Sequence, residues 1–328
     1  MAPVNHPEQT MQSPNRPALL LKARPTPTQL ADRFRDPEPD GVELYLDVRD
    51  VSGSDWREHL ERAWKSTDSH SETVALIEGP IRSLDGAYFD LTRAADADHD
   101  LIHRLLAAAK ILDAQAINIH CIAPRFSAES LAEPARDEAL AAALPFVRWF
   151  AAACAGNGVQ PLIENIPPVG RMREAAFVYT PIGVEPRDLC WFAANANGLG
   201  ITLDTSHAQL YINAATGQVG VEADRPALQS VVATYARRPH PANLGDYVEQ
   251  VAGCIRSAHI SNAHGLLGEG LPYGEGDVAL DPIVRSLATH ADFLVTEPLE
   301  PDPNRAVLMR DCWQRMRSAL GAGHGDRE

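Results

Sequence analysis

The segment from Gly200 to Leu210, GITLDTSHAQL, joins a short apolar run to two residues that could do chemistry. The run ends in Asp204, and His207 follows three residues later. A buried aspartate is costly unless its charge is neutralised, and carboxylate and imidazole groups are both metal ligands. The simpler alternative is that Asp204 caps the next helix, with His207 on its first turn. Partners elsewhere in the chain must decide between these two interpretations.

Other apolar runs of the chain also end in polar or ionisable residues. If the runs are parallel strands of a barrel, their carboxyl ends emerge on one face, so these side chains are expected around one cavity. The full set is Lys22, Glu78, His120, Glu164 with Asn165, Asp204, His259 with Ser261 and Asn262, and Glu297.

Four members of this set predict a metal site. Glu164, Asp204 and Glu297 offer three carboxylates, and His259 offers an imidazole. Three carboxylates are too costly to bury together without a cation, so we expect one divalent ion. Oxygen-rich ligation favours Mn²⁺ or Mg²⁺, with Co²⁺, Fe²⁺ or Zn²⁺ as alternatives. His207, one helical turn beyond Asp204, would face the same cavity as a substrate contact or a further ligand.

The remaining residues of the set are candidates for substrate binding. Lys22, Glu78, His120 and Asn262 would line the cavity beside the metal. Two alternatives stay open: His120 could be a core histidine with satisfied hydrogen bonds, and Glu78 could form an ion pair with Lys22 or Arg24 across the barrel mouth. His99 and His103 are four residues apart, and their surroundings indicate a solvated helix surface rather than a metal site.

Short apolar or β-branched runs alternate with amphipathic segments along the whole chain. The predicted strands are 18–22, 42–46, 74–78, 116–120, 161–165, 200–204, 257–261 and 293–297. The predicted helices are 28–35, 55–65, 97–113, 134–156, 186–197, 244–254, 281–290 and 304–320. Alternation implies parallel pairing, because each return to the same end of the sheet needs a crossover.

Eight such units predict an α/β fold, the TIM (β/α)8 barrel, as a single domain over residues 17–320. A doubly wound open sheet is the rival, yet it usually has a Gly-rich turn after the first strand, where this chain reads Lys22-Ala-Arg-Pro-Thr. The wide gap between the sixth and seventh strands predicts an insertion at about 211–243.

Barrels of this type place their active sites at the carboxyl ends of the strands, so we interpret the insertion as a lid or specificity loop. Its run Ala236-Arg237-Arg238-Pro239-His240 could contact an anionic substrate group or form a solvated surface turn. The loop after Glu78, through Arg82, Tyr88 and Phe89, is a second candidate wall.

Composition limits the classes of partner. The 328 residues include 29 basic and 44 acidic side chains, a net charge of −15 that disfavours nucleic acid and anionic membranes. Five cysteines without a Cys-x-x-Cys pair indicate neither a disulfide framework nor a zinc knuckle, and suit the cytoplasm. Residues 1–16 and 321–328 are expected to be tails, the first disordered and without a signal peptide. No apolar run approaches the roughly 20 residues of a membrane span.

At these residues the chain resembles the xylose isomerase-like TIM-barrel superfamily of sugar isomerases and epimerases, which is related to the AP endonucleases. The resemblance covers about residues 18–320, and its most specific parts are ITLDTSHA, AHISN, Tyr273-Gly274-Glu275-Gly276-Asp277 and VTEPLE. In the epimerase branch, the positions that match Glu164, Asp204, His259 and Glu297 hold a divalent metal, usually Mn²⁺. The two glutamates there also act as acid and base.

The resemblance implies a metal-dependent isomerase or epimerase of a sugar or related hydroxy-carbonyl compound, acting through an enediolate. A dehydratase of a keto-polyol or natural-product intermediate on the same site is the nearest alternative, and a non-catalytic binding barrel is another. AP endonuclease activity is not expected, because Leu271-Pro272-Tyr273 stands where the DNA-repair branch has an Asp-x-His ligand motif. The expected partner is a small molecule, and such barrels often form homodimers.

Overall fold

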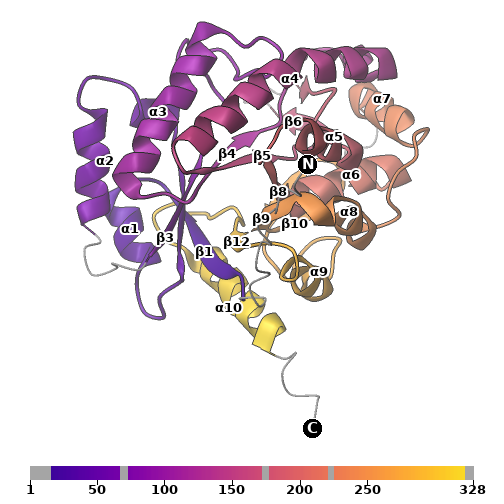
Figure 1. The fold of residues 1–328 in the computed structure, drawn as a ribbon. Coiled ribbons are helices and arrows are strands. Elements are labelled where there is room, and N and C mark those ends of the chain that lie inside the picture. Colours follow the sequence, from indigo (N-terminus) through magenta and orange to yellow (C-terminus); the bar gives the residue numbers. More distant parts are fainter. Residues whose placement is uncertain (1–15, 67–72, 172–176, 221–224, 322–328) are drawn as a thin grey trace, which may run out of the picture.

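Eight parallel strands close into a barrel in a computed structural model that describes residues 16–66, 73–171, 177–220 and 225–321 (Figure 1). The order around the barrel is β1-β12-β9-β8-β5-β4-β3-β2, so the first and last strands pair. This confirms the TIM barrel and excludes the open sheet. The expected tails lie outside the described residues, apart from Arg16 and Gly321. The barrel strands are β1 (Ala18–Ala23), β2 (Gly41–Tyr45), β3 (Val74–Glu78), β4 (Ala116–His120), β5 (Gln160–Glu164), β8 (Gly200–Asp204), β9 (Ile255–Ile260) and β12 (Phe293–Thr296).

The inward faces of the strands form two layers. An apolar layer closes the amino-terminal end of the barrel, and it contains Leu20, Leu76, Ala116, Leu162 and Val295. Side chains two residues apart in a strand point to the same face. The next inward position on these strands is therefore polar, as in Leu20 followed by Lys22. This period places the chemically active side chains together above a closed apolar floor.

Helices surround the barrel and bury their apolar faces against the outer sides of the strands (Figure 1). Eight of the helices were predicted from the sequence, and the chain between β8 and β9 adds two more. The helices are α1 (Pro27–Arg33), α2 (Trp56–Lys65), α3 (Asp96–Leu112), α4 (Glu133–Gly156), α5 (Pro186–Asn195), α6 (Thr205–Thr216), α7 (Pro226–Tyr235), α8 (Leu244–Val251), α9 (Leu280–Leu287) and α10 (Val307–Gly321).

Helix α4 is long and apolar enough, by length and composition, to be compared with a membrane span. This differs from the expectation that no apolar run approaches the length of a membrane span. Helix α4 is a barrel helix, because Phe146 and Phe150 on one face are buried in the core around β5. Beside Phe146, Trp149 packs against the rings of His99 and His103, with ring centroids 4.3 and 5.4 Å away. His103 is exposed, as expected for a solvated helix surface, whereas His99 is half-buried.

The expected insertion at 211–243 is largely helical in its described part, where a lid or specificity loop was expected. It contains the end of α6 and the whole of α7, which packs beside α6 on the flank of the barrel. Arg238 does not face a substrate. Its guanidinium group lies 2.6 Å from Glu185 Oε1 and 2.8 Å from Glu133 Oε1. The segment therefore forms ion pairs with the amino-terminal ends of α4 and α5.

Two antiparallel hairpins stand at the carboxyl end of the barrel. The first pairs β6 (Val169–Arg171) with β7 (Phe177–Tyr179), and the second pairs β10 (Asn262–His264) with β11 (Gly268–Leu271). Strands this short carry too little alternation to be recognised in a sequence. Both hairpins follow strands that end in site residues, so they are placed to wall the barrel mouth.

Candidate metal centre

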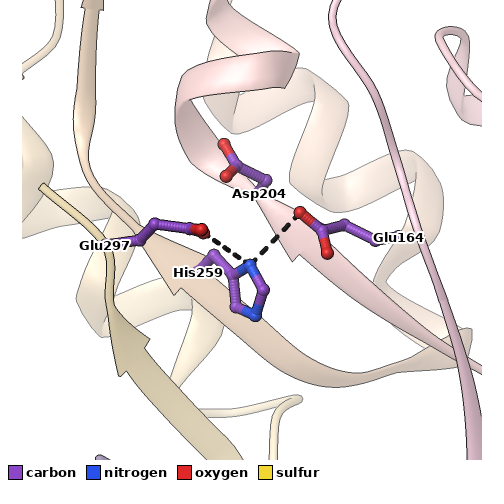
Figure 2. Close-up of side chains that lie close together, drawn as sticks. All are labelled: Glu164, Asp204, His259 and Glu297. Carbon is purple, nitrogen blue, oxygen red and sulfur yellow. Dashed lines mark hydrogen bonds and ion pairs between the residues drawn. The ribbon is translucent and has the colours of Figure 1, made fainter. Parts of the chain in front are cut away.

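Glu164, Asp204, His259 and Glu297 converge at the carboxyl end of the barrel (Figure 2). Each residue offers one ligand atom, and these atoms lie within 4.8 Å of one another. Nδ1 of His259 is 3.2 Å from Glu164 Oε1 and 2.6 Å from Glu297 Oε2. The structure therefore brings together the four residues that the sequence predicted as a metal site.

Asp204 combines the two roles considered for it. Its Oδ1 accepts a hydrogen bond from the His207 backbone N–H at 2.7 Å, which caps α6, and the residue also belongs to the cluster of potential ligands. Asn165 fixes the backbone at this point. It accepts from the Asp204 N–H at 2.7 Å and donates to the Asp204 carbonyl at 3.0 Å. The helix cap thus orients a carboxylate that can still offer its second oxygen.

Asn118 orients Glu164. Its side-chain amide, which points inward from β4, donates to Glu164 Oε2 at 2.5 Å. The bond occupies one carboxylate oxygen and leaves Oε1 facing His259. Asn118 was not predicted from the sequence, because only residues at or next to the end of each strand were considered. The available signal was a polar side chain two residues before His120, in the same inward register.

A second acidic group surrounds Lys22, directly behind the four residues. The Lys22 ammonium group forms ion pairs with Glu297 and Glu78, and Glu43 Oε2 lies 3.9 Å from it. Glu43 Oε2 is also 2.7 Å from His259 Nε2, and both side chains are fully buried. Glu43 was missed as well, since it lies in the middle of β2. The Glu78–Lys22 pair was one of the two alternatives for Glu78.

The site holds more buried negative charge than its own cations balance. Burial would raise the pKa of Glu164, but the positive charges of His259 and His120 outweigh it and lower the pKa to about 2. Burial also opposes ionisation of His259, whose pKa is nevertheless raised well above its ordinary value by Glu164, Glu297 and Glu43. Glu297 Oε2 is buried and lies 2.6 Å from His259 Nδ1, but it accepts no hydrogen bond of good geometry. This donor set fits a divalent cation.

Two cavities open beside the cluster. One, of about 270 Å³, is lined by residues that include Glu164, Glu297, His120 and His207. The other, of about 340 Å³, lies on the β1 and β12 side and is lined by Lys22, Glu78 and Glu297 among others. The substrate candidates Lys22, Glu78, His120 and His207 therefore do reach space next to the cluster.

His207 points one ring nitrogen into this space. Its Nδ1 donates to the Asn165 carbonyl at 2.9 Å, which leaves Nε2 facing the cavity, 3.8 Å from Glu269 Oε2. Burial lowers the pKa of His207, but the carboxylates of Asp204 and Glu164 outweigh it and raise the pKa to about 9. His207 is thus a cationic donor beside the cluster. Glu269, on the β10–β11 hairpin, lines the cavity and is a third site residue, after Asn118 and Glu43, that was not predicted from the sequence.

Asn262 is not placed as expected. Its side-chain amide donates to the Val278 carbonyl at 2.7 Å, and its oxygen accepts from the Ala263 N–H at 2.9 Å. These bonds hold the chain around the β10–β11 hairpin, and Asn262 is not among the residues that line the two cavities. Its side-chain hydrogen bonds support the site wall.

The family model described as "Xylose isomerase-like TIM barrel" matches residues 39–312, which is most of the chain and includes the four clustered residues. The chain belongs to this family. No curated protein matches the sequence closely.

Several solved structures share the fold of this xylose isomerase-like barrel. A D-tagatose 3-epimerase-like protein has 14% identity and a TM-score of 0.63, over 93% of this chain and 99% of that chain. A 3-keto-D-glucoside 4-epimerase from E. coli has 14% identity and a TM-score of 0.59, over 92% and 100%. An AP endonuclease, family 2, from Brucella melitensis has 14% identity and a TM-score of 0.56, over 90% and 98%. Since an epimerase and an AP endonuclease share this one fold, the activity of this chain must be argued from its site.

Metal binding to this family member is expected to release protons. Burial raises the pKa of Asp204 to about 7, and the pKa of His259 is raised well above its ordinary value. A ligand must lose its proton before it can bind a metal, so each ion displaces at least one proton below pH 7. The apparent Mn²⁺ affinity should fall at least about tenfold per pH unit between pH 7 and pH 5. Calorimetric titration in buffers of different ionisation enthalpy measures both quantities, and an affinity that stays constant over this range would contradict the assignment.

Proposed function

We propose that this protein is a divalent-metal-dependent isomerase or epimerase of hydroxy-carbonyl compounds. The observation that carries the proposal is the convergence of two glutamates, Glu164 and Glu297, with Asp204 and His259 at the mouth of the barrel. One structural neighbour is an epimerase and another is an epimerase-like protein, which supports the same reaction class. A non-catalytic barrel would have no need to keep so costly a buried cluster.

The residues that would hold the ion are Glu164, Asp204, His259 and Glu297, with Mn²⁺ as the preferred metal because three of the four donors are carboxylates. When bound, the ion would supply a Lewis acid that stabilises negative charge on the carbonyl and hydroxyl oxygens of a substrate. His259 would offer Nδ1, since Nε2 faces Glu43. Asp204 would offer the oxygen that does not cap α6.

Glu164 and Glu297 would move the proton. They come from β5 and from the end of β12, on different sides of the ring of strands, so they can reach opposite faces of a substrate lying between them. One carboxylate would take the proton from the carbon next to the carbonyl, giving an enediolate. The other glutamate, after taking up a proton from solvent, would donate it to the opposite face, and the first would then lose its proton to solvent. Asn118 and Lys22 would hold the two carboxylates in position. His207 Nε2 would donate to a substrate oxygen.

The same proton removal would begin a dehydration, in which a β-hydroxyl then leaves as water. An endonuclease is disfavoured, because a net charge of −15 and a carboxylate-rich mouth repel a phosphate backbone. Isomerisation and dehydration share the removal of the proton and differ only in the steps that follow, so their products distinguish the two reactions.

Proton NMR in D₂O tests the proposal with the Mn²⁺-loaded protein and a panel of ketoses. We expect deuterium to appear at the carbon next to the carbonyl, without loss of water and only when the metal is present. An enone or other dehydrated product would replace isomerisation by the lyase reaction. Exchange that is equally fast after chelation of the metal would contradict metal dependence.

A further inference from the structure

The cavity of about 270 Å³ beside Glu164 and Glu297 has one apolar and one acidic side. The apolar side is built from aliphatic and aromatic residues on four separate segments above the strand ends. These residues are Ile81, Tyr88, Ile122, Ile166, Val178 and Tyr179. The acidic side is formed by Glu164, Glu269 and Glu297. A ligand that fills the cavity must therefore satisfy both surfaces.

The apolar side forms a layer directly above the polar ring. Ile122 follows His120 by two residues, and Ile166 follows Glu164 by two. From the other direction, Val178 and Tyr179 come from β7 of the first hairpin. A substrate whose oxygens reach Glu164 would thus have its remaining atoms between these apolar side chains.

The charges around this cavity disfavour an anionic group. No lysine or arginine is among the described residues that line it. The neighbouring Arg82 stacks on Tyr88, with its guanidinium carbon 3.7 Å from the ring centroid, and donates to the Gly86 carbonyl at 3.3 Å. Lys22, on the far side of Glu297, is already paired with Glu78 and Glu297. Among the described residues that line this cavity, a substrate phosphate would find three carboxylates and, as the one cationic donor, His207 beside the clustered residues.

Apart from the phenol hydroxyls of Tyr88 and Tyr179, the described side chains of the wall offer little to a string of hydroxyl groups. Thr180 lines the cavity, but its hydroxyl donates to the Ile182 carbonyl at 2.9 Å and accepts from the Ala123 N–H at 3.1 Å. At the mouth, Ile81 is 41% exposed and Phe126 is 69% exposed, with the Phe126 ring centroid 6.4 Å from that of Tyr88. Exposed apolar side chains next to a cavity are typical of a binding surface.

We propose that the substrate is an uncharged hydroxy-carbonyl compound that carries an apolar alkyl or aryl substituent. Its hydroxy-carbonyl end meets the four clustered residues, and its substituent lies against Ile122, Ile166 and Val178. This inference rests on the proposed function for the reacting end. The proposed substrate differs from a free sugar or a sugar phosphate in the part of the molecule that lies against the apolar wall.

Binding of two matched series to the Mn²⁺-loaded full chain tests this inference by calorimetry. The first series is the 1-hydroxy-2-alkanones from four to eight carbons, which share one hydroxy-carbonyl end. A fully buried methylene raises affinity about fourfold, so even half that effect per carbon gives more than about tenfold across the series. The second is dihydroxyacetone and its phosphate, where we expect no gain from the phosphate. An affinity that is independent of chain length, or tightened by the phosphate, would overturn the inference.

A pair of valine-to-threonine variants locates the effect. Val178→Thr places a hydroxyl in the wall at nearly constant volume and should remove most of the gain with chain length. Val307→Thr makes the same change at a valine that is 56% exposed and lines neither cavity, and should keep the gain. A gain that survives Val178→Thr would place the apolar group elsewhere and overturn the inference.

Deuterium exchange on the same compounds separates this inference from the proposed function. Binding that strengthens with chain length but shows no exchange supports the apolar ligand class and contradicts the isomerase chemistry. Exchange of dihydroxyacetone without any gain from the alkyl chain supports the chemistry and overturns the apolar ligand class.

Discussion

Replacing Glu164 or Glu297 with glutamine is expected to lower turnover by about 10²- to 10⁴-fold, the usual contribution of a positioned acid or base. The amide keeps the size of the side chain but cannot accept the proton. Burial raises the pKa of Glu297, yet His259 and Lys22 outweigh it and hold the pKa well below its ordinary value, so the group is an ionised acceptor at neutral pH. The rate is measured at saturating Mn²⁺, with the metal content of each variant determined in parallel.

Glu249→Gln on α8 is the matched control, since this glutamate is exposed and lines neither cavity. It should leave the rate unchanged. If each glutamate acts on one face of the substrate, each single variant should still exchange deuterium into one epimer and not into the other. Near-normal turnover in both variants would remove these residues from the chemistry.

Replacing Lys22 with methionine is expected to destabilise the metal-free protein by about 3–5 kcal/mol at pH 7, the cost of breaking a buried ion pair. Lys22 is the cation between Glu43, Glu78 and Glu297, and its side chain is only 10% exposed. Burial would lower the pKa of Lys22, but Glu297 and Glu78 raise it well above its ordinary value, so its charge is present throughout the neutral range. Denaturant unfolding measures the loss of stability.

The loss should be smaller when Mn²⁺ is present, because a bound ion neutralises the same carboxylates. At one hundred times its dissociation constant, a ligand that binds only the folded protein adds about 2.7 kcal/mol. Lys65→Met is the control. It breaks a solvent-exposed pair with Glu61 on α2, and exposed pairs of this kind contribute little to stability. Equal effects of the two substitutions would mean that Lys22 does not neutralise a buried cluster.

Most of the barrel could be predicted from local sequence patterns. The eight barrel strands lie within two residues of the predicted ranges, because buried parallel strands appear as short apolar runs bounded by polar residues. Helix α7 was missed, since the wide gap after β8 was interpreted as a loop, and α6 was considered only as the helix that Asp204 would cap. Their apolar residues, such as Tyr211 and Tyr235, pack against each other and not only against the barrel.

The site was predictable where a residue ends a strand. Glu164, Asp204, His259 and Glu297 were found in this way, and the closure of the barrel brings them together. Glu43 and Asn118 were missed because they lie inside strands, where only the inward register reveals them. Asn262 was assigned to the cavity from its neighbourhood in the sequence. The conformation of the β10–β11 hairpin, in which Asn262 lies, sets the direction of its side chain, and no local sequence pattern predicts that conformation.

Equilibrium dialysis of the purified protein against Mn²⁺ tests the central claim most directly, because it measures the metal site without any knowledge of the substrate. We expect one ion per chain at pH 7.5. We also expect Asp204→Asn to weaken Mn²⁺ binding by more than the roughly 10- to 100-fold loss seen when an outer partner of a metal ligand is removed. A protein that binds no divalent ion, or binds one equally well after Asp204→Asn, would contradict it.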